Sequence, residues 1–158
     1  MQDEKSFTVL AVLQNQWFND PDRVREIVSD MTRRERRRWD SAMLFMGCLS
    51  GRRLKRAFGE DAVYEWETTN ASAEIGGQSA ARFPADLDHL RAEIEDVQPD
   101  LILAFGKIAA VALPRVWNGP LIIGPHPAAR PPIDAPAELA RMAGELEAWR
   151  LKMHEVNR

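Results

Sequence analysis

Short apolar stretches along the chain predict the strands of a buried sheet. Residues 7–13, 101–105 and 121–123 are rich in Val, Ile and Leu and are bounded by polar, Gly or Pro positions, which is typical of strands covered on both faces. Residues 62–68 alternate between apolar and polar side chains, and this period of two predicts another strand. We therefore expect four strands, in the chain order 7–13, 62–68, 101–105 and 121–123.

Capping signals between these stretches predict the helices. Asp20 before Pro21 and Thr32 three residues before Glu35 are typical helix starts, and Asp86 precedes a stretch with an apolar face of helical spacing. The predicted helices cover residues 21 to about 28, 33 to about 45, 50–58 before Gly59, 87–97 before Pro99, a short alanine-rich segment opened by Gly106 and Lys107, and 135 to about 156. Residues 70–84 predict a long loop, and loops of that length are usually functional.

Strands that alternate with helices predict an α/β fold, because right-handed crossovers make such strands parallel. We expect a three-layer α/β/α arrangement around a four-stranded, mainly parallel central sheet, and a single domain over residues 1–158. Polar residues follow all four strands, at the sheet edge where ligands bind in open α/β folds. They are Gln14, Asn15 and Gln16, then Thr68, Thr69 and Asn70, then Gly106 with Lys107, and finally His126.

Composition narrows the function classes. The chain has 158 residues, a net charge of −3, and 45% apolar residues, as expected of a soluble globular domain. With the single cysteine Cys48, expected to be a buried inert thiol, and three scattered histidines, we expect no disulfide, no metal site and no cofactor. The sequence shows no signal peptide or membrane span, so we expect a cytoplasmic monomer without a membrane partner.

Two clusters of cations stand out against the acidic total. Residues 33–38 contain five arginines, and residues 52–56 add four more cations. Local patches of this kind govern nucleic-acid affinity more directly than the net charge does. The alternative is that each cluster forms an ordinary solvated helix face.

The segment at residues 120–132 joins the last predicted strand to a proline-rich loop. His126 lies between Pro125 and Pro127, directly after the apolar strand, so it occupies a stiffened backbone at the ligand-binding edge. Arg130, four residues on, has a side chain suited to a phosphate. The alternative is a surface turn with an incidental histidine.

From about residue 9 to residue 131 the chain resembles the uracil-DNA glycosylase superfamily. The first strand of that family leads into a loop with a water-positioning Asp, Asn or Glu, and Asn15 occupies the matching polar position. The last strand leads into a His-Pro-Ser or His-Pro-Ala loop, and His126-Pro127-Ala128 matches it closely. Two further segments resemble the family in the right order, at residues 45–54 and 99–110.

The resemblance implies a role for each strand end. Asn15 would orient the attacking water, and His126 would stabilise the anion of the departing base by a hydrogen bond. Asn70 would read the base edge because an amide both donates and accepts, with Gln14 nearby and the ring of Trp17 or Phe18 stacked on the flipped base. Contacts to the DNA backbone would come from Ser50, Gly51, Arg52, Lys107 and Arg130.

The first loop departs from the family pattern. Family members usually carry Gly-x-x-Pro-Gly there, whereas residues 13–17 contain neither Gly nor Pro, and the cysteines of the iron–sulfur branches are absent. Because an amide is not a general base, Asn15 predicts slower chemistry than an Asp would give. The altered loop suits an unusual base, such as a hypermodified phage base.

The sequence therefore predicts a DNA glycosylase that removes uracil or a modified base from single- or double-stranded DNA. Three alternatives stay open: a non-catalytic nucleic-acid-binding protein on the same fold, an enzyme of a phage base-modification pathway, and a nucleoside-processing enzyme. Individual residues also have plain alternatives. Lys107 suits a solvated helix start, Arg130 an ion pair with the acidic C-terminal helix, Asn70 a turn cap, and Trp17 core packing.

Overall fold

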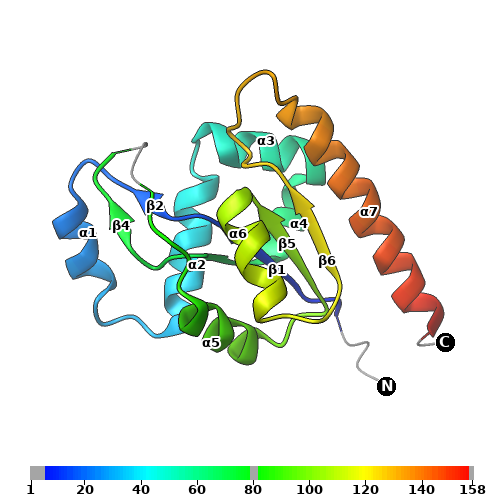
Figure 1. The fold of residues 1–158 in the computed structure, drawn as a ribbon, viewed down its shortest axis with the longest axis horizontal. Coiled ribbons are helices and arrows are strands. Elements are labelled where there is room, and N and C mark those ends of the chain that lie inside the picture. The colour runs from blue at the N-terminus through cyan, green and yellow to red at the C-terminus, as the bar shows by residue number, and fades with distance from the viewer. Residues whose placement is uncertain (1–5, 79–81, 157–158) are drawn as a thin grey trace.

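A parallel sheet forms the centre of the molecule in the computed structural model, which describes residues 6–78 and 82–156. Its four strands, in spatial order, are β3 (Glu67–Asn70), β1 (Val9–Leu13), β5 (Leu101–Phe105) and β6 (Leu121–Gly124) (Figure 1). All three pairings are parallel, with Leu10 opposite Glu67 and Ile102, and Ile102 opposite Leu121. The prediction of a four-stranded parallel α/β sheet is confirmed.

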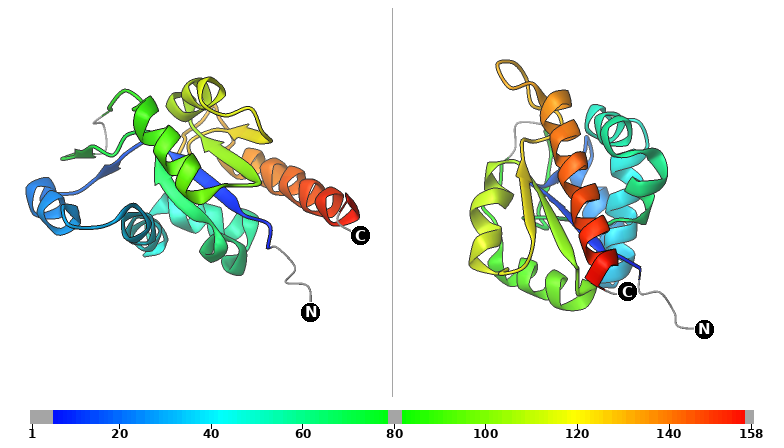
Figure 2. Two further views of the ribbon diagram at one scale, coloured as in Figure 1. Left: turned by 90° about the horizontal axis from the view of Figure 1, so that it is seen from below. Right: turned by 90° about the vertical axis from the view of Figure 1, so that its right-hand side faces the viewer.

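Helices cover both faces of this sheet (Figure 2). They are α1 (Pro21–Val28), α2 (Arg33–Phe45), α3 (Leu49–Phe58), α4 (Glu60–Glu65), α5 (Leu87–Val97), α6 (Lys107–Ala112) and α7 (Ala135–Val156), with a 3-10 turn η1 (Leu113–Arg115). Their starts follow local chemistry: the Thr32 hydroxyl accepts a hydrogen bond from the backbone N–H of Glu35, and the Glu35 carboxylate accepts one from that of Thr32. Among the described residues, no helix combines the length and the apolar character needed to cross a membrane.

Strands β1 and β5 are buried on both faces because helices cover the sheet on each side, whereas the edge strand β6 leaves Ile123 43% exposed, so the expected burial of both its faces is wrong. Side chains alternate along a strand, so Val9, Ala11 and Leu13 of β1 face one side, and Leu10 and Val12 face the other. The first side packs against residues of α2, α3, α4 and α7, and the second against α5, α6 and η1. The three layers predicted from the sequence are thus present.

The strand predicted at residues 62–68 is wrong. Residues 60–65 form helix α4, and the strand begins only at Glu67. Tyr64 and Trp66 are two residues apart, as on one face of a strand, while Val63 and Trp66 are three apart, as on one face of a helix, so the apolar pattern fits both. In the structure Val63 and Trp66 are buried and Tyr64 is exposed. Packing against α3 and the sheet selects the helix.

The long loop predicted at residues 70–84 contains a short strand instead of being wholly irregular. Strand β4 (Ile75–Gly76) pairs in parallel with β2 (Gln16–Trp17), and the two form a separate two-stranded sheet. Neither strand was predicted, because two residues are too few to show a periodicity. Residues 79–81 of this segment lie outside the described residues.

Candidate active site at the carboxyl edge of the sheet

The first loop and the segment after β3 run side by side beyond the sheet. The backbone N–H of Ala71 donates to the carbonyl of Leu13 at 2.8 Å, and that of Ser72 donates to the carbonyl of Gln14 at 3.0 Å. The β2–β4 pairing then continues the same parallel ribbon. The first loop is therefore extended backbone that is fixed by a neighbouring segment.

Asn15 lies in this ribbon, between β1 and β2, and is half-buried. Its amide Nδ2 donates to the carbonyl of Gln16 at 3.2 Å, and its Oδ1 accepts from the Gln14 amide at 3.3 Å. The structure thus places Gln14 and Asn15 together at the carboxyl end of β1, as predicted. Both ends of the Asn15 amide already have protein partners, and these fix its orientation.

The two aromatic residues that follow differ in their surroundings. Phe18 is half-buried, and its ring centroid lies 5.4 Å from that of Trp39. Trp17 is 47% exposed, so the alternative that it packs in the core does not hold. Of the two, Trp17 is the more exposed.

Asn70 ends β3 opposite Leu13, and only 5% of it is exposed. Beside it lies a residue that the sequence analysis did not select, Asp40 of α2, which is also buried. Burial raises the pKa of Asp40 to about 6, although the Arg36 guanidinium at 2.8 Å and the Asn70 amide both act to lower it. The only sequence signal for Asp40 was its spacing of four residues from Arg36 on a helix.

His126 follows β6 and packs against the start of α6. A Cβ atom at Gly106 would lie 3.7 Å from the Cβ of His126, and the Gly106 N–H donates to the carbonyl of Gly124 at 2.9 Å. Gly106 has a φ of 95°, a backbone conformation that favours glycine. The end of β5 and the end of β6 therefore meet closely at His126.

A hydrogen bond determines which nitrogen of the neutral His126 ring carries the proton. The backbone N–H of Ala128 donates to its Nδ1 at 3.0 Å, so Nδ1 is an acceptor and the neutral ring carries its proton on Nε2. Burial lowers the pKa of His126, and the Arg82 guanidinium lowers it further. The site thus presents a neutral imidazole with an N–H donor at Nε2.

Arg53 of α3 supports the turn that carries His126, and the sequence analysis missed it. Its Nη1 donates to the carbonyl of Pro127 at 3.0 Å and to that of Ala129 at 3.1 Å. Within the turn, the Ala129 N–H donates to the carbonyl of His126 at 2.9 Å. An arginine within a run of cations carries no sequence signal for such a role.

The predicted DNA-contacting residues lie on three separate segments. Ser50 is half-buried and Arg52 is exposed at the start of α3, Lys107 is exposed at the first residue of α6, and Arg130 is exposed beyond the His126 turn. Gly51 is buried, and a Cβ there would overlap the carbonyl oxygen of Leu44. Gly51 therefore serves the close packing of α3 on α2 rather than a contact with DNA. Through Arg53, the start of α3 and the His126 turn belong to one surface.

Cys48 is exposed, which corrects the expectation of a buried thiol. It is the N-cap of α3, where its Sγ accepts from the backbone N–H of Gly51 at 3.5 Å and donates to the carbonyl of Leu44 at 3.1 Å. The sequence pattern missed this because Cys is not a preferred N-cap residue.

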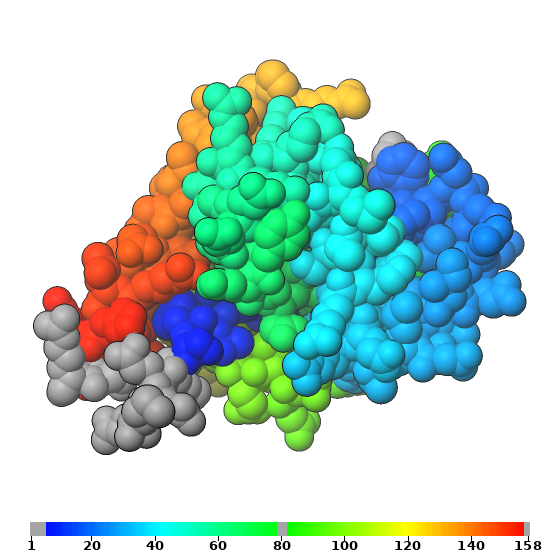
Figure 3. Space-filling view, turned by 180° about the vertical axis from the view of Figure 1, so that it is seen from behind, coloured from blue at the N-terminus to red at the C-terminus, as the bar shows by residue number. Residues whose placement is uncertain are grey.

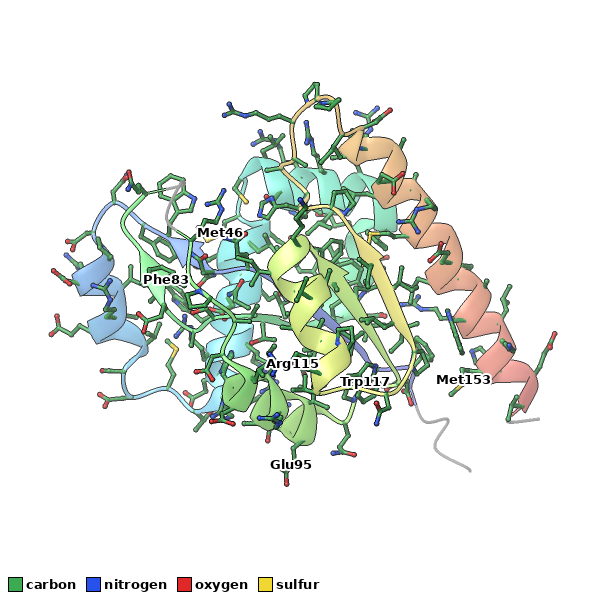
Figure 4. The ribbon with its side chains drawn as sticks, in the orientation of Figure 1. Met46, Phe83, Glu95, Arg115, Trp117 and Met153 are labelled. Atoms are coloured by element: carbon green, nitrogen blue, oxygen red, sulfur yellow. The ribbon has the colours of Figure 1, made fainter. Side chains whose placement is uncertain are left out.

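A groove of about 920 Å³ lies beside this edge rather than over His126. It is lined by residues of α1, of the β3–β4 connection and of the start of α5, among them Arg25, Ile75, Phe83 and Arg91. Figure 4 shows Phe83 on the side of the molecule that carries β2 and β4. Among the described residues that line it, arginines and carboxylates are equal in number.

Within residues 6–78 and 82–156, no group of three or more His, Cys, Asp or Glu side chains is placed to hold a metal ion. The side chains that the fold brings to the carboxyl edge are the amides of Gln14, Asn15 and Asn70, the Asp40 carboxyl beside Asn70, the His126 imidazole and the surrounding cations. No protein-family model matches this chain, and no curated protein matches it in sequence.

Proposed function

We propose that this protein is a DNA glycosylase that hydrolyses the N-glycosidic bond of uracil or of a modified pyrimidine. The observation that carries the proposal is the hydrogen bond from the Ala128 N–H to His126 Nδ1, since it leaves Nε2–H as a neutral donor at the carboxyl edge of the sheet. Glycosidic cleavage leaves negative charge on the departing base, and a preorganised donor stabilises that charge. A neutral donor does this without the cost of burying a cation.

The other strand ends supply the remaining parts of the reaction. The bond between C1′ of the sugar and the base nitrogen breaks, and its electron pair leaves with the base. Water adds to C1′, its proton passes to solvent, and the products are an abasic site and the free base. Asn15 orients the water through its amide, Asn70 reads the base edge, and Trp17 stacks on the flipped ring.

The DNA backbone is held by cations around the edge. Ser50 and Arg52 at the start of α3, Lys107 on α6 and Arg130 beyond the His126 turn contact phosphates in this proposal. No cofactor takes part.

One observation favours a second candidate, a nucleic-acid-binding protein without turnover. Asn15 donates to Gln16 and accepts from Gln14, so the protein already uses at least two of the four hydrogen-bonding positions of its amide. The fold and the cations suit DNA binding equally well in both candidates.

The test is incubation with oligonucleotides that contain uracil or one of a panel of modified pyrimidines, in single- and double-stranded form, followed by alkali cleavage at abasic sites. We expect His126→Ala to reduce the cleavage rate by a factor of about 10² to 10³, the usual loss when one preorganised donor is removed. His154→Ala, a matched change in the exposed last turn of α7, leaves the rate unchanged. Abasic product at the wild-type rate from His126→Ala contradicts the proposal, and DNA binding without product from any substrate supports the second candidate.

A further inference from the structure

Helix α3 is a fixed platform beneath the His126 turn. Its Gly51 allows the helix backbone to approach the carbonyl of Leu44 at the end of α2, where any side chain would collide. Its Lys55 donates from Nζ to the carbonyl of Phe45 at 2.9 Å, and Leu54 is fully buried in the core. A side chain on the outward face of α3 therefore starts from a well-defined backbone position.

Arg53 extends from this platform to the turn. One nitrogen, Nη1, lies between the carbonyls of Pro127 and Ala129 at 3.0 and 3.1 Å. These residues flank Ala128, whose N–H donates to His126 Nδ1. The Pro127 carbonyl and the Ala128 N–H belong to the same peptide group, so the guanidinium holds the peptide that sets the histidine tautomer, together with the peptide group that follows Ala129.

We propose that Arg53 is a positioning residue, which keeps the His126 turn in the conformation that presents Nε2–H to the departing base. This inference rests on the proposed glycosylase function for its meaning in catalysis. The planar guanidinium suits the task, because its donors lie in one fixed plane and it stays charged at every relevant pH. Without it, two carbonyls of a half-buried turn lose their partner, and the Ala128 N–H is free to leave Nδ1.

The experiment is ¹⁵N NMR of the imidazole rings in the full-length protein, with activity measured on the same samples. The chain has three histidines, and His126→Gln assigns the signal of His126 by its loss. In wild-type protein we expect the Nε2–H tautomer and a pKa below the ordinary value for histidine. In Arg53→Gln we expect a mixture of tautomers and a pKa that moves back up.

Arg56→Gln is the matched control, since Arg56 is an exposed arginine on the same helix. It should leave the tautomer and the pKa of His126 unchanged. Arg53→Lys keeps the charge and can donate to one carbonyl, so the tautomer ratio and the pKa of His126 should lie between those of the wild type and Arg53→Gln. This variant replaces Arg53→Gln in the test if Arg53→Gln does not fold. In steady-state assays Arg53→Gln should lower kcat by about tenfold or more with little change in KM, because the donor is misplaced while DNA binding is kept.

A His126 tautomer and pKa that stay as in the wild type in a folded Arg53 variant would overturn the assignment. The two proposals fail separately. A changed tautomer in Arg53→Gln, with no abasic product from wild-type protein, supports the positioning role and contradicts the glycosylase. Abasic product from the wild-type protein, with an unchanged His126 tautomer in Arg53→Gln, supports the glycosylase and contradicts the positioning role.

Discussion

The two arginine-rich segments of this chain have the same character in the sequence and opposite roles in the structure. Residues 33–38 lie on α2 and residues 52–56 on α3, two helices that contact each other and share the face seen in Figure 3. On α2, Arg33, Arg36 and Arg37 form ion pairs with carboxylates. On α3, Arg52, Arg53 and Lys55 donate to main-chain carbonyls.

Arg37 shows the first role most clearly. It is 4% exposed and forms ion pairs with Glu67 at 3.0 Å, Glu93 at 2.8 Å and Asp96 at 2.6 Å. Arg33 pairs with Glu93 at 3.0 Å, so the carboxylates of β3 and α5 offset the charge of this cluster. These ion pairs join α2 to the sheet and to α5. The segment at residues 33–38 is therefore not a solvated face or a basic patch along its whole length.

The α3 cluster keeps its charge. Arg53 donates to the carbonyls of the His126 turn, Lys55 to that of Phe45, and Arg52 to that of Gly47. A carbonyl is a dipole, so it satisfies a donor without cancelling a full charge. The number of cations in a segment of the sequence therefore does not decide whether the segment can bind a phosphate. The partner of each cation decides it, because only a carboxylate cancels the charge.

The sharpest way to break this comparison is Arg37→Met. Removal of one partner from a buried ionic cluster leaves uncompensated carboxylates, and the usual loss is about 3–5 kcal/mol in the free energy of unfolding. Arg38→Met is the matched control, because Arg38 is exposed, and it should change that free energy by about 0.5 kcal/mol or less. Urea unfolding of both variants measures the difference, and equal stabilities would show that the buried ion pairs of Arg37 do not contribute to stability.

The pH dependence of stability tests the carboxylate side of the same cluster. The pKa of buried Asp40 is raised in the folded protein from 3.8 to about 6, so the folded state favours its protonated form. Its contribution to stability is full below pH 3.8 and is lost as the pH rises through about 6. Relative to Asp40→Asn, which does not titrate, wild-type protein should lose up to about 3 kcal/mol over this range.

The measurement is the free energy of unfolding of the two proteins between pH 4 and pH 8. Asp61→Asn, an exposed carboxylate on α4, serves as the control and should follow the wild-type curve. A difference between wild type and Asp40→Asn that does not vary with pH would mean that Asp40 titrates as an exposed carboxylate does.

The smallest expected effect concerns DNA binding, and it tests whether the cations of α3 are available to phosphates. Arg52→Gln on α3 should reduce the slope of log affinity against log salt by about 0.7 to 0.9, the value of one lost phosphate contact. Arg34→Gln on α2 should leave the slope unchanged, because the neighbouring carboxylates weaken the local positive field. Fluorescence anisotropy with a labelled oligonucleotide at several salt concentrations measures both, and equal slopes for the two variants would remove the distinction between the segments.

Features that depend on neighbours along the chain were predictable. The cap of α2 follows from Thr32 and Glu35 alone, and the buried strands β1 and β5 follow from their apolar runs. The ends of parallel strands share one edge, so the placement of Asn15, Asn70 and His126 at that edge followed once the strands were identified. The strand at residues 62–68 was wrong because its short apolar pattern fits two periodicities.

The sequence by itself therefore determined the fold class, the capped starts of helices such as α2 and the ends of strands β1, β5 and β6, but it missed α4 and misplaced β3. Only the tertiary structure decided which cations are neutralised, which one holds the His126 turn and where the first loop runs. The reason is distance along the chain. Arg37 meets Glu93 across 56 positions and Arg53 meets Ala129 across 76, and no local pattern of residues distinguishes these arginines from their exposed neighbours.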